Sequence, residues 1–535
     1  MLTQLIFGLS GGLSLFIYGI NITGEGLQKL AGDKIKNIIK VLTTNRFSGV
    51  LVGIIITSII QSSSATSVLA IGFVNSGLMT FEQSLSIIFG ANIGTTITTQ
   101  IIAFKLTTYC LPILTIGFLL NFICKKRIWK NTGLFLLGLG MLFLGMSIMS
   151  GAIEPFATDP MIKDLFIKFS VNPSLGILTG IIATAIFQSS SVTTGIVLAL
   201  ASVGLVDLTG AIPIILGCNI GTCVTALLAS IGTNTNAKRT AIGHLIFNIL
   251  GVLLFLPFIK YFQLIVMFTS TNIMRQCAFA HTIFNVIGTL LILPFIGLFT
   301  KLIIKLIPNK DGEECDPFEM KHLDEHLLST PSIAIDTAIK EILHTLKMTS
   351  KMIELAIEGF FGKIVSLDQI EKKEDIVDYR REKITEYLVK LMEQDISHEE
   401  SQKIPKLLHV INDIEKIGDH AMNLRNLARR KHENNLPFTG DALSEIVQIH
   451  GSVKDMIEQT EEALSFISVE KAKLIYNTEN KINNQRRQFK KNHIERLQGK
   501  KCHHVSGIVF LDMINNFEKI GDFLTNIADA IVGTL

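Results

Sequence analysis

The stretch IIQSSSATSV, residues 59–68, places three consecutive serines inside an otherwise apolar segment, and IFQSSSVTTG, residues 186–195, repeats the pattern. Serine side chains compete for backbone hydrogen bonds and favour an interruption of a helix. We therefore predict that each serine run separates two half-helices and that each segment forms a re-entrant helical hairpin. Non-helical backbone at membrane depth is tolerated only where protein buries it or a water-filled cavity faces it. The two hairpin tips are thus the first candidates for a binding site.

The two serine runs belong to an internal duplication. Gln61 falls on Gln188 with a shift of 127 positions, and the match continues without a gap to GANIGTT (90–96), which falls on GCNIGTC (217–223). Chance similarity between apolar segments would align scattered Leu and Ile residues, but it would not keep Gln, Ser, Asn and Thr in register. We infer that the two regions are copies of one segment.

The composition divides the chain into two parts. Of 535 residues, 48% are hydrophobic and 18% are charged, and the charged residues are concentrated in the last two fifths. Apolar stretches such as 113–124 and 134–153 each supply most of a spanning helix of about 20 residues. The sequence predicts an all-α protein, with a polytopic membrane domain over 1–306, a linker over 307–317 and a cytosolic helical-bundle domain over 318–535.

Basic residues set the expected orientation, because cytoplasmic loops of membrane proteins carry an excess of Lys and Arg. Placing the basic loops over 29–46 and 125–130 in the cytoplasm puts the N-terminus outside and the charged C-terminal half in the cytosol. The repeats over about 1–124 and 131–260 are then inverted relative to each other, and an extra helix over 277–300 follows. Inverted repeats are typical of secondary transporters, which bind their substrate near the bilayer midplane. We expect a multi-pass protein of the inner (cytoplasmic) membrane, surrounded by lipid.

The repeated segments lack fixed charge at their centres. Glu82 is the charged residue of 49–104 and Asp207 that of 174–232, and the expected topology places both near membrane edges. Hydroxyls, amides and half-helix N-termini bind anions, and the oxygens of the same groups hold Na⁺. Because an uncompensated charge in the membrane costs at least about 2.5 kcal/mol, the pattern favours cation-coupled anion transport. The alternative is that the serines are small-residue packing contacts between helices.

On these motifs, the sequence over 1–306 resembles the type II sodium-dependent phosphate cotransporter family. The resemblance implies that the two tips form the phosphate and sodium sites, with Na⁺ as the coupling ion and inorganic phosphate as the substrate. The residues implicated at the tips are Gln61, Ser62, Ser63, Ser64, Thr66, Gln188, Ser189, Ser190, Ser191 and Thr193. The second motif adds Asn92, Thr95, Asn219 and Thr222. Cys223 stands where the first copy has Thr96, so the copies are not equivalent there.

A shorter repeat follows the second copy. GHLIFNILG (243–251) and AHTIFNVIG (280–288) each place His and Asn four residues apart, on one helix face. The pairs are His244 with Asn248 and His281 with Asn285. A proton-sensing or ligand role is one interpretation, and hydrogen bonding between helices is the one that we favour.

The C-terminal half is also duplicated, since IEKIGDHAMNL (414–424) recurs as FEKIGDFLTNI (517–527). This motif resembles that of PhoU-like regulatory proteins over about 318–535, built as two three-helix repeats. The resemblance implies divalent metal binding, for which oxygen ligands at helical spacing are suited. The candidate metal ligands are Glu415, Asp419, Glu518 and Asp522. The alternative is a network of ion pairs between helices.

The expected function is sodium-coupled uptake of phosphate, with a cytosolic regulatory domain. An enzyme is not expected, because the serine motifs have no Gly-x-Ser-x-Gly context, no nearby base and no Walker sequence. Two alternatives stay open: transport of another anion, such as sulfate or a dicarboxylate, and a membrane-tethered phosphate sensor. We expect no nucleic-acid partner, and a homodimer is left open.

Overall fold

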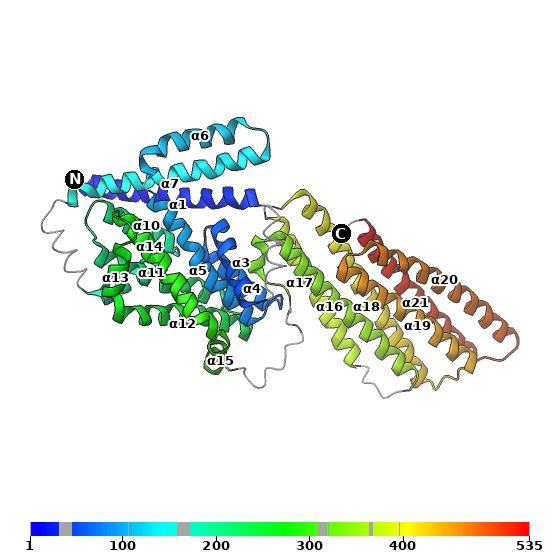
Figure 1. Ribbon diagram of the computed structural model, residues 1–535. Helices are drawn as coiled ribbons and strands as arrows, with labels where there is room; N and C mark the ends of the chain where they lie inside the picture. The colour runs from blue at the N-terminus through cyan, green and yellow to red at the C-terminus, as the bar shows by residue number, and fades with distance from the viewer. Residues whose placement is uncertain are drawn as a thin grey trace. The chain divides into compact units, whose positions relative to one another are not determined.

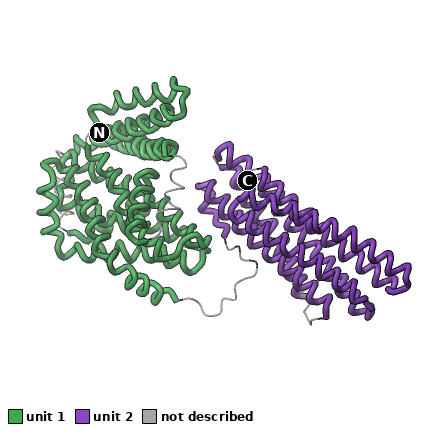
Figure 2. The backbone as a smooth tube through the Cα atoms, turned by 45° about the vertical axis from the view of Figure 1, so that its right-hand side comes forward, with its two compact units in different colours: residues 1–311 green, residues 312–535 purple. Residues whose placement is uncertain are grey.

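The computed structural model describes residues 2–31, 45–104, 106–157, 172–308, 318, 320, 322–362, 368–394 and 396–533. Within these ranges every regular element is a helix, which confirms the predicted all-α class. The chain forms two compact units, 1–311 and 312–535 (Figure 2). Most of the predicted linker, and several basic residues that set the expected orientation (Lys34, Lys36, Lys40, Lys105, Lys163 and Lys168), lie outside the described residues.

Unit 1 begins with a long helix, a broken helix pair and two further helices. Their bounds are α1 (Leu2–Ala31), α3 (Arg46–Ile60), α4 (Ser63–Asn75), α5 (Phe81–Ala103), the short η1 (Leu106–Tyr109) and α6 (Cys110–Ile123). The second copy repeats this order as α7 (Arg127–Ala157), α9 (Pro173–Phe187), α10 (Ser190–Ser202), α11 (Leu208–Ala229) and α12 (Thr235–Phe255).

In the described residues that follow, two helices are kinked. Helix α12 continues through η2 (Leu256–Phe258) into α13 (Ile259–Met267), and α14 (Ile273–Ile292) continues through η3 (Leu293–Phe295) into α15 (Ile296–Leu306). Pro257 and Pro294 lie at the two short 3₁₀ turns, where the missing proline amide breaks the helical ladder. In the described part of the chain, six helical segments are long and apolar enough to cross a membrane, and all six lie in unit 1.

Glycines let the helices of each copy approach closely. A Cβ atom on Gly53 of α3 would lie 2.0 Å from the carbonyl oxygen of Ile87 on α5. In the second copy, a Cβ atom on Gly180 of α9 would lie 2.1 Å from the carbonyl oxygen of Ile214 on α11. Only glycine permits such contact, which is the usual basis of helix association where lipid removes the hydrophobic driving force. Helices α1 and α7 also pack side by side (Figure 1), with Gly19 against the backbone of Leu142.

In its described residues, unit 2 has six long helices in two sets of three (Figure 1). The bounds are α16 (Pro331–Phe360), α17 (Asp368–Met392), α18 (His398–Glu433), α19 (Gly440–Phe466), α20 (Val469–Gln498) and α21 (His504–Val532), preceded by the short η4 (Glu325–Ser329). Apolar residues at three- and four-residue spacing form one continuous core. Local signals fit this arrangement, because Ser397 and Glu400 form a capping box at the start of α18.

Candidate transport site

Each serine run interrupts a helix at the same two residues. Gln61 ends α3 and Gln188 ends α9, both in the left-handed backbone region with φ of 61° and 52°. Ser62 and Ser189 then have extended backbone and cap the next helix, where their hydroxyls accept from the amides of Ala65 and Val192. The predicted interruption is therefore present in both copies.

The left-handed glutamines carry a specific signal. This conformation at a helix C-terminus is usually taken by glycine, because an L side chain costs roughly 1–2 kcal/mol there. Both copies have glutamine instead, at Gln61 and at Gln188. Strained backbone of this kind clusters at functional sites, and its occurrence at the same position of both copies makes the two amide groups site candidates.

Each break places the start of a helix next to the end of the one before it. Helices α4 and α10 start at Ser63 and Ser190, directly after the breaks, and the first amides of a helix have no acceptor within it. The tips touch, because the Ser64 hydroxyl donates to the carbonyl of Gln188 at 3.4 Å. Each tip thus offers the unpaired first amides of a helix, with a partial positive charge, as donors to an anion.

The acidic residues of the two repeated segments, Glu82 and Asp207, lie at helix ends. Glu82 is in the first turn of α5, and Asp207 caps α11 by accepting from the amide of Gly210 at 2.9 Å. Both are therefore engaged at helix ends and not at the tips. An anion bound at the tips would be held by amides and hydroxyls alone.

Thr66 and Thr193 hold each hairpin together. Thr57 donates to the Thr66 hydroxyl at 2.9 Å, and Thr184 donates to the Thr193 hydroxyl at 3.0 Å. Thr66 and Thr193 in turn donate to the carbonyls of Ser62 and Ser189. These two predicted site residues thus fix the arms and the cap of each hairpin.

The second motif lies on α5 and α11, behind the tips. The Asn92 amide donates to Asn248 at 2.9 Å, and the His244 ring lies 3.3 Å from the other end of the Asn92 amide. The Thr99 hydroxyl is 3.1 Å from His281. His244, Asn248 and His281 thus link α12 and α14 to α5, as the interpretation that we favour predicts, whereas Asn285 donates to the carbonyl of His281 within α14.

The remaining residues of the second motif bond within their own helices. Thr95 donates to the carbonyl of Ala91 at 3.1 Å and Thr222 to that of Cys218 at 2.9 Å, while Asn219 donates to Ile215 at 3.1 Å. Each of these side chains keeps an oxygen that can accept a bond or bind a cation. The motif therefore supplies oxygen atoms and no charge.

The two glutamines differ in their surroundings. Gln61 is 6% exposed, and its Oε1 accepts from Thr98 at 2.8 Å. Gln188 is exposed, and its side chain has no hydrogen bond to a described residue. Thr98 is not among the residues predicted from sequence, although the shift of 127 positions places it on Thr225, another threonine.

The duplicated motif of unit 2 has different surroundings in its two copies. In the first, Glu374 and Asp378 of α17 lie near Glu415 and Asp419 of α18; burial, followed by the neighbouring carboxylates, raises the pKa of Glu374 and of Asp378. In the second, Arg486 donates to Glu518 at 2.7 Å. Basic residues thus partly neutralise both copies, through Lys416 beside Glu415 in the first and Arg486 beside Glu518 in the second, and the first copy carries the additional carboxylates of α17.

The candidate metal ligands are bonded to lysines on their own helices. Asp419 lies 2.9 Å from Lys416, and Asp522 lies 2.8 Å from Lys519. Among the residues that the structure describes, no three His, Cys, Asp or Glu side chains are placed to hold a metal ion. The acidic surface of the first copy suits a cation in its charge, although its carboxylates are not drawn together.

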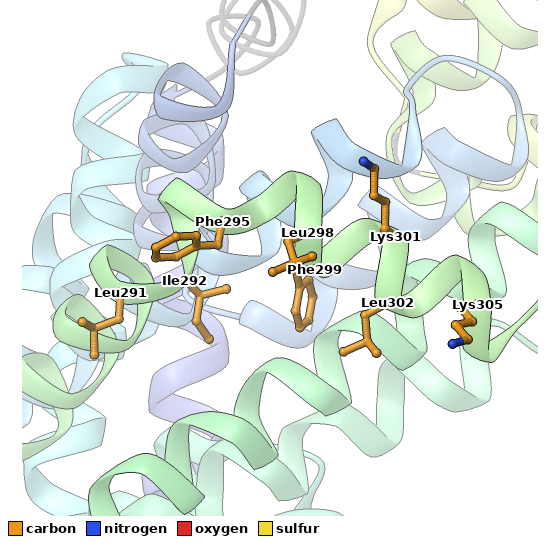
Figure 3. A pocket seen from close by; sticks show the side chains of 8 residues that line it. All are labelled: Leu291, Ile292, Phe295, Leu298, Phe299, Lys301, Leu302 and Lys305. Atoms are coloured by element: carbon orange, nitrogen blue, oxygen red, sulfur yellow. The ribbon is translucent and has the colours of Figure 1, made fainter.

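A separate groove of ≈ 540 Å³ runs along α14, η3 and α15 (Figure 3). Its lining is apolar apart from two lysines, and consists of Leu291, Ile292, Phe295, Leu298, Phe299, Lys301, Leu302 and Lys305. None of these residues belongs to the hairpin tips. The lining suits a lipid surface and not a small hydrated anion.

Two family models match the chain. A sequence model of the Na⁺/Pi-cotransporter family matches residues 15–151 and again 145–292, and one of the PhoU domain matches 342–428 and 446–531. Each model thus matches twice, as the internal duplications predict.

Three curated relatives illustrate the similarity. "Uncharacterized protein YqeW" of Bacillus subtilis is 36% identical over 46% of this chain and 79% of its own length. "Putative inorganic phosphate export protein YjbB" of Escherichia coli K12 is 22% identical over 98% of this chain and 97% of its own. "Sodium-dependent phosphate transport protein 2A" of Ovis aries is 44% identical over 16% of this chain and 14% of its own.

The long apolar helices and the family matches define a multi-pass membrane protein of a transporter class. The chain belongs to the Na⁺/Pi-cotransporter family and carries a PhoU domain after its membrane unit.

Proposed function

We propose that residues 1–306 carry inorganic phosphate across the cytoplasmic membrane together with sodium, and that the substrate binds where the two hairpin tips meet. The observation that carries the proposal is the pair of left-handed glutamines, Gln61 and Gln188, each followed directly by a helix N-terminus. A Gln, three Ser and free amides at each tip supply hydrogen-bond donors to phosphate oxygens. The second-motif residues Asn92, Thr95, Asn219 and Thr222 supply oxygens to sodium.

The absence of fixed charge at the tips supports coupling to a cation. Phosphate carries one or two negative charges at neutral pH, and moving an uncompensated charge through a membrane costs at least about 2.5 kcal/mol. The described tips offer no lysine or arginine to balance it. Co-bound sodium would supply the balance, which makes the sodium gradient the driving force.

We expect purified protein in liposomes to accumulate labelled phosphate when sodium is high outside, and not when potassium replaces sodium. The physical reason is that phosphate crosses only when sodium neutralises the tip site. A matched run with a proton gradient and no sodium is the control. Uptake that follows protons instead would refute sodium coupling, and uptake of sulfate in preference to phosphate would refute the substrate.

Export of phosphate is the second candidate function. A relative whose name describes phosphate export matches this chain over nearly its full length, including the PhoU region. A symporter moves phosphate outward together with sodium, so an inward sodium gradient opposes export by a symporter. It does not oppose an exporter that works without sodium, and the two candidates therefore differ in their driving force. Efflux from phosphate-loaded vesicles that an inward sodium gradient does not slow would favour export.

We further propose that the hairpins α3–α4 and α9–α10 enter the membrane from opposite faces as inverted, re-entrant repeats, with the N-terminus outside and unit 2 in the cytosol. A cysteine at Ser270, in the turn between α13 and α14, is expected to react with an impermeant maleimide from outside. One at Lys126 is expected to react only from inside, because it lies in a basic loop. Labelling of both from the same side would contradict the inverted arrangement.

Unit 2 is proposed as a regulatory domain that binds a divalent cation on the acidic surface of its first copy. Glu415 and Asp419 would hold the ion with help from Asp378, whereas Glu518 and Asp522 fit it less well because Arg486 neutralises Glu518. Oxygen ligands of this type suit Mg²⁺, Ca²⁺ or Mn²⁺. The ion would signal the state of the cytosol to the transporter.

Thermal unfolding of the full chain with and without Mn²⁺ tests this assignment. A ligand present at 100 times its Kd stabilises the folded state by about 2.7 kcal/mol, so the unfolding temperature is expected to rise. Glu415→Gln is expected to remove the rise, and the matched variant Glu518→Gln to keep it. Equal responses of the two variants would contradict the assignment, and unchanged phosphate transport upon Mn²⁺ addition would remove the regulatory role.

A further inference from the structure

Helices α12 and α14 end in the same way. Each runs into a turn with the sequence LPF, at 256–258 and at 293–295, and then continues as a shorter helix, α13 or α15. The two turns are 37 positions apart. With this shift, α15 can be compared with α13 residue by residue.

The length of α14 places its kink at the edge of a membrane. Helix α14 and α15 together form one of the apolar segments that are long enough to cross a bilayer. The 20 residues of α14 span about 30 Å, which is the thickness of the hydrocarbon core of a bilayer. The turn at Pro294 and helix α15 therefore come at the level of the lipid headgroups.

Helix α15 has a buried face and an exposed face. Ile296, Phe299 and Ile303 are buried in unit 1. On the other face, Leu298 is 70% exposed and Leu302 is 45% exposed, and both line the groove in Figure 3. A lipid chain is the covering that such apolar side chains find at this depth.

Two lysines distinguish this helix from its counterpart. Lys301 and Lys305 are exposed, stand one turn apart and line the groove, whereas Leu264 and Phe268 occupy the equivalent positions of α13. Neither lysine forms an ion pair with a residue that the structure describes. The groove thus combines an apolar floor with two cations that lack an anionic partner among the described residues.

Two arginines hold α15 at its ends. Arg46 of α3 donates to the carbonyl of Pro294 at 3.1 Å, just before α15 begins. Arg239 of α12 donates to the carbonyl of Ile307 at 2.9 Å, directly after α15 ends. Because other helices bind both ends of α15, the groove is a built feature of unit 1.

We propose that this groove binds an anionic phospholipid, with an acyl chain along the apolar lining and the headgroup phosphate paired with Lys301 and Lys305. A free phosphate ion would leave the apolar lining uncovered, and a zwitterionic lipid would leave the two lysine charges unbalanced. Basic pockets beside membrane helices at the cytoplasmic face bind anionic headgroups in this way. The site is independent of the ion and substrate that are carried, and only its assignment to the cytoplasmic leaflet rests on the proposed topology.

Native mass spectrometry of the full chain measures the retained lipid directly. The protein is exposed to equal amounts of phosphatidylglycerol and phosphatidylcholine with the same acyl chains, so the lipids differ only in their headgroups. We expect phosphatidylglycerol to be retained in preference. Lys301→Gln and Lys305→Gln should each lower this preference about fivefold, the factor for about 1 kcal/mol per basic residue near an anionic surface.

Three controls separate the site from general charge effects. Lys260→Gln removes an exposed lysine from α13, the counterpart helix, and should leave the preference unchanged. Lys301→Arg keeps the positive charge and should also keep the preference. Glycerol 3-phosphate has the phosphate without the chains and should displace none of the lipid, whereas displacement would assign the lysines to a free phosphate compound.

Equal retention of the two lipids would overturn the proposal, as would an equal loss of preference in Lys260→Gln and Lys301→Gln. The same spectra report how many copies of the chain are associated. A dimer that Leu298→Asn separates with either lipid would instead assign the groove to a second copy. Lipid retention needs no flux, so a failure of the phosphate-transport test leaves this one intact.

Discussion

Gln61→Ala and Gln188→Ala are each expected to reduce sodium-driven phosphate uptake by about 10- to 150-fold, the factor for losing a hydrogen bond of about 1.5–3 kcal/mol to a charged ligand. Each substitution removes an amide that both donates and accepts, from a tip that has no fixed charge to compensate. Uptake into liposomes, corrected for the amount of protein incorporated, is the measurement.

A glycine variant separates the amide from the backbone. Gln61→Gly and Gln188→Gly adopt the left-handed conformation without strain, so they should fold at least as stably as the alanine variants. They should nevertheless transport as poorly. Normal uptake by either glycine variant would mean that glutamine only shapes the break, and normal uptake by both alanine variants would mean that the tips are packing elements.

Gly53→Ala and Gly180→Ala are expected to disrupt the membrane unit. The new Cβ atoms would lie 2.0 and 2.1 Å from carbonyl oxygens, whereas a close carbon–oxygen contact is about 3.3 Å. The helices must separate by about 1 Å, and overpacking of this kind typically costs about 1–3 kcal/mol or more.

The control substitution, Gly288→Ala, is expected to have the opposite effect on stability. Gly288→Ala adds a methyl group in α14 where a Cβ atom meets nothing within 4 Å. Alanine favours a helix over glycine by about 1 kcal/mol, so this variant should be neutral or stabilised. Unfolding temperature in detergent and the yield of monodisperse protein measure both effects. A Gly53→Ala variant as stable as Gly288→Ala would show that α3 and α5 are not packed as described.

The helical breaks could be predicted from sequence because their cause is local. Serine is both a poor residue for a helix interior and a good N-cap, so Ser62 and Ser189 mark the start of the next helix without help from the rest of the fold. The duplication was equally visible, since it depends only on register. The predicted tip residues themselves remain predictions about binding.

The difference between the tips could not be predicted. The local sequences around Gln61 and Gln188 are nearly the same, and what separates the two residues is tertiary: Thr98 donates to Gln61, and Gly24 of α1 packs beside it. Likewise, the pairing of Glu518 with Arg486 depends on the packing of α20 on α21. Only tertiary structure distinguishes two copies whose motifs match.

The glycine contacts between α1 and α7 have a consequence for how the chain is made. Helix α1 leaves the ribosome before α7, which is complete only about 125 residues later, and this takes roughly 6–25 s at about 5–20 residues per second. During this time Gly19 and its neighbours on α1 lack the partner backbone against which they pack. A nascent membrane protein of this kind needs a temporary neighbour, which the insertion machinery or lipid must provide until α7 arrives.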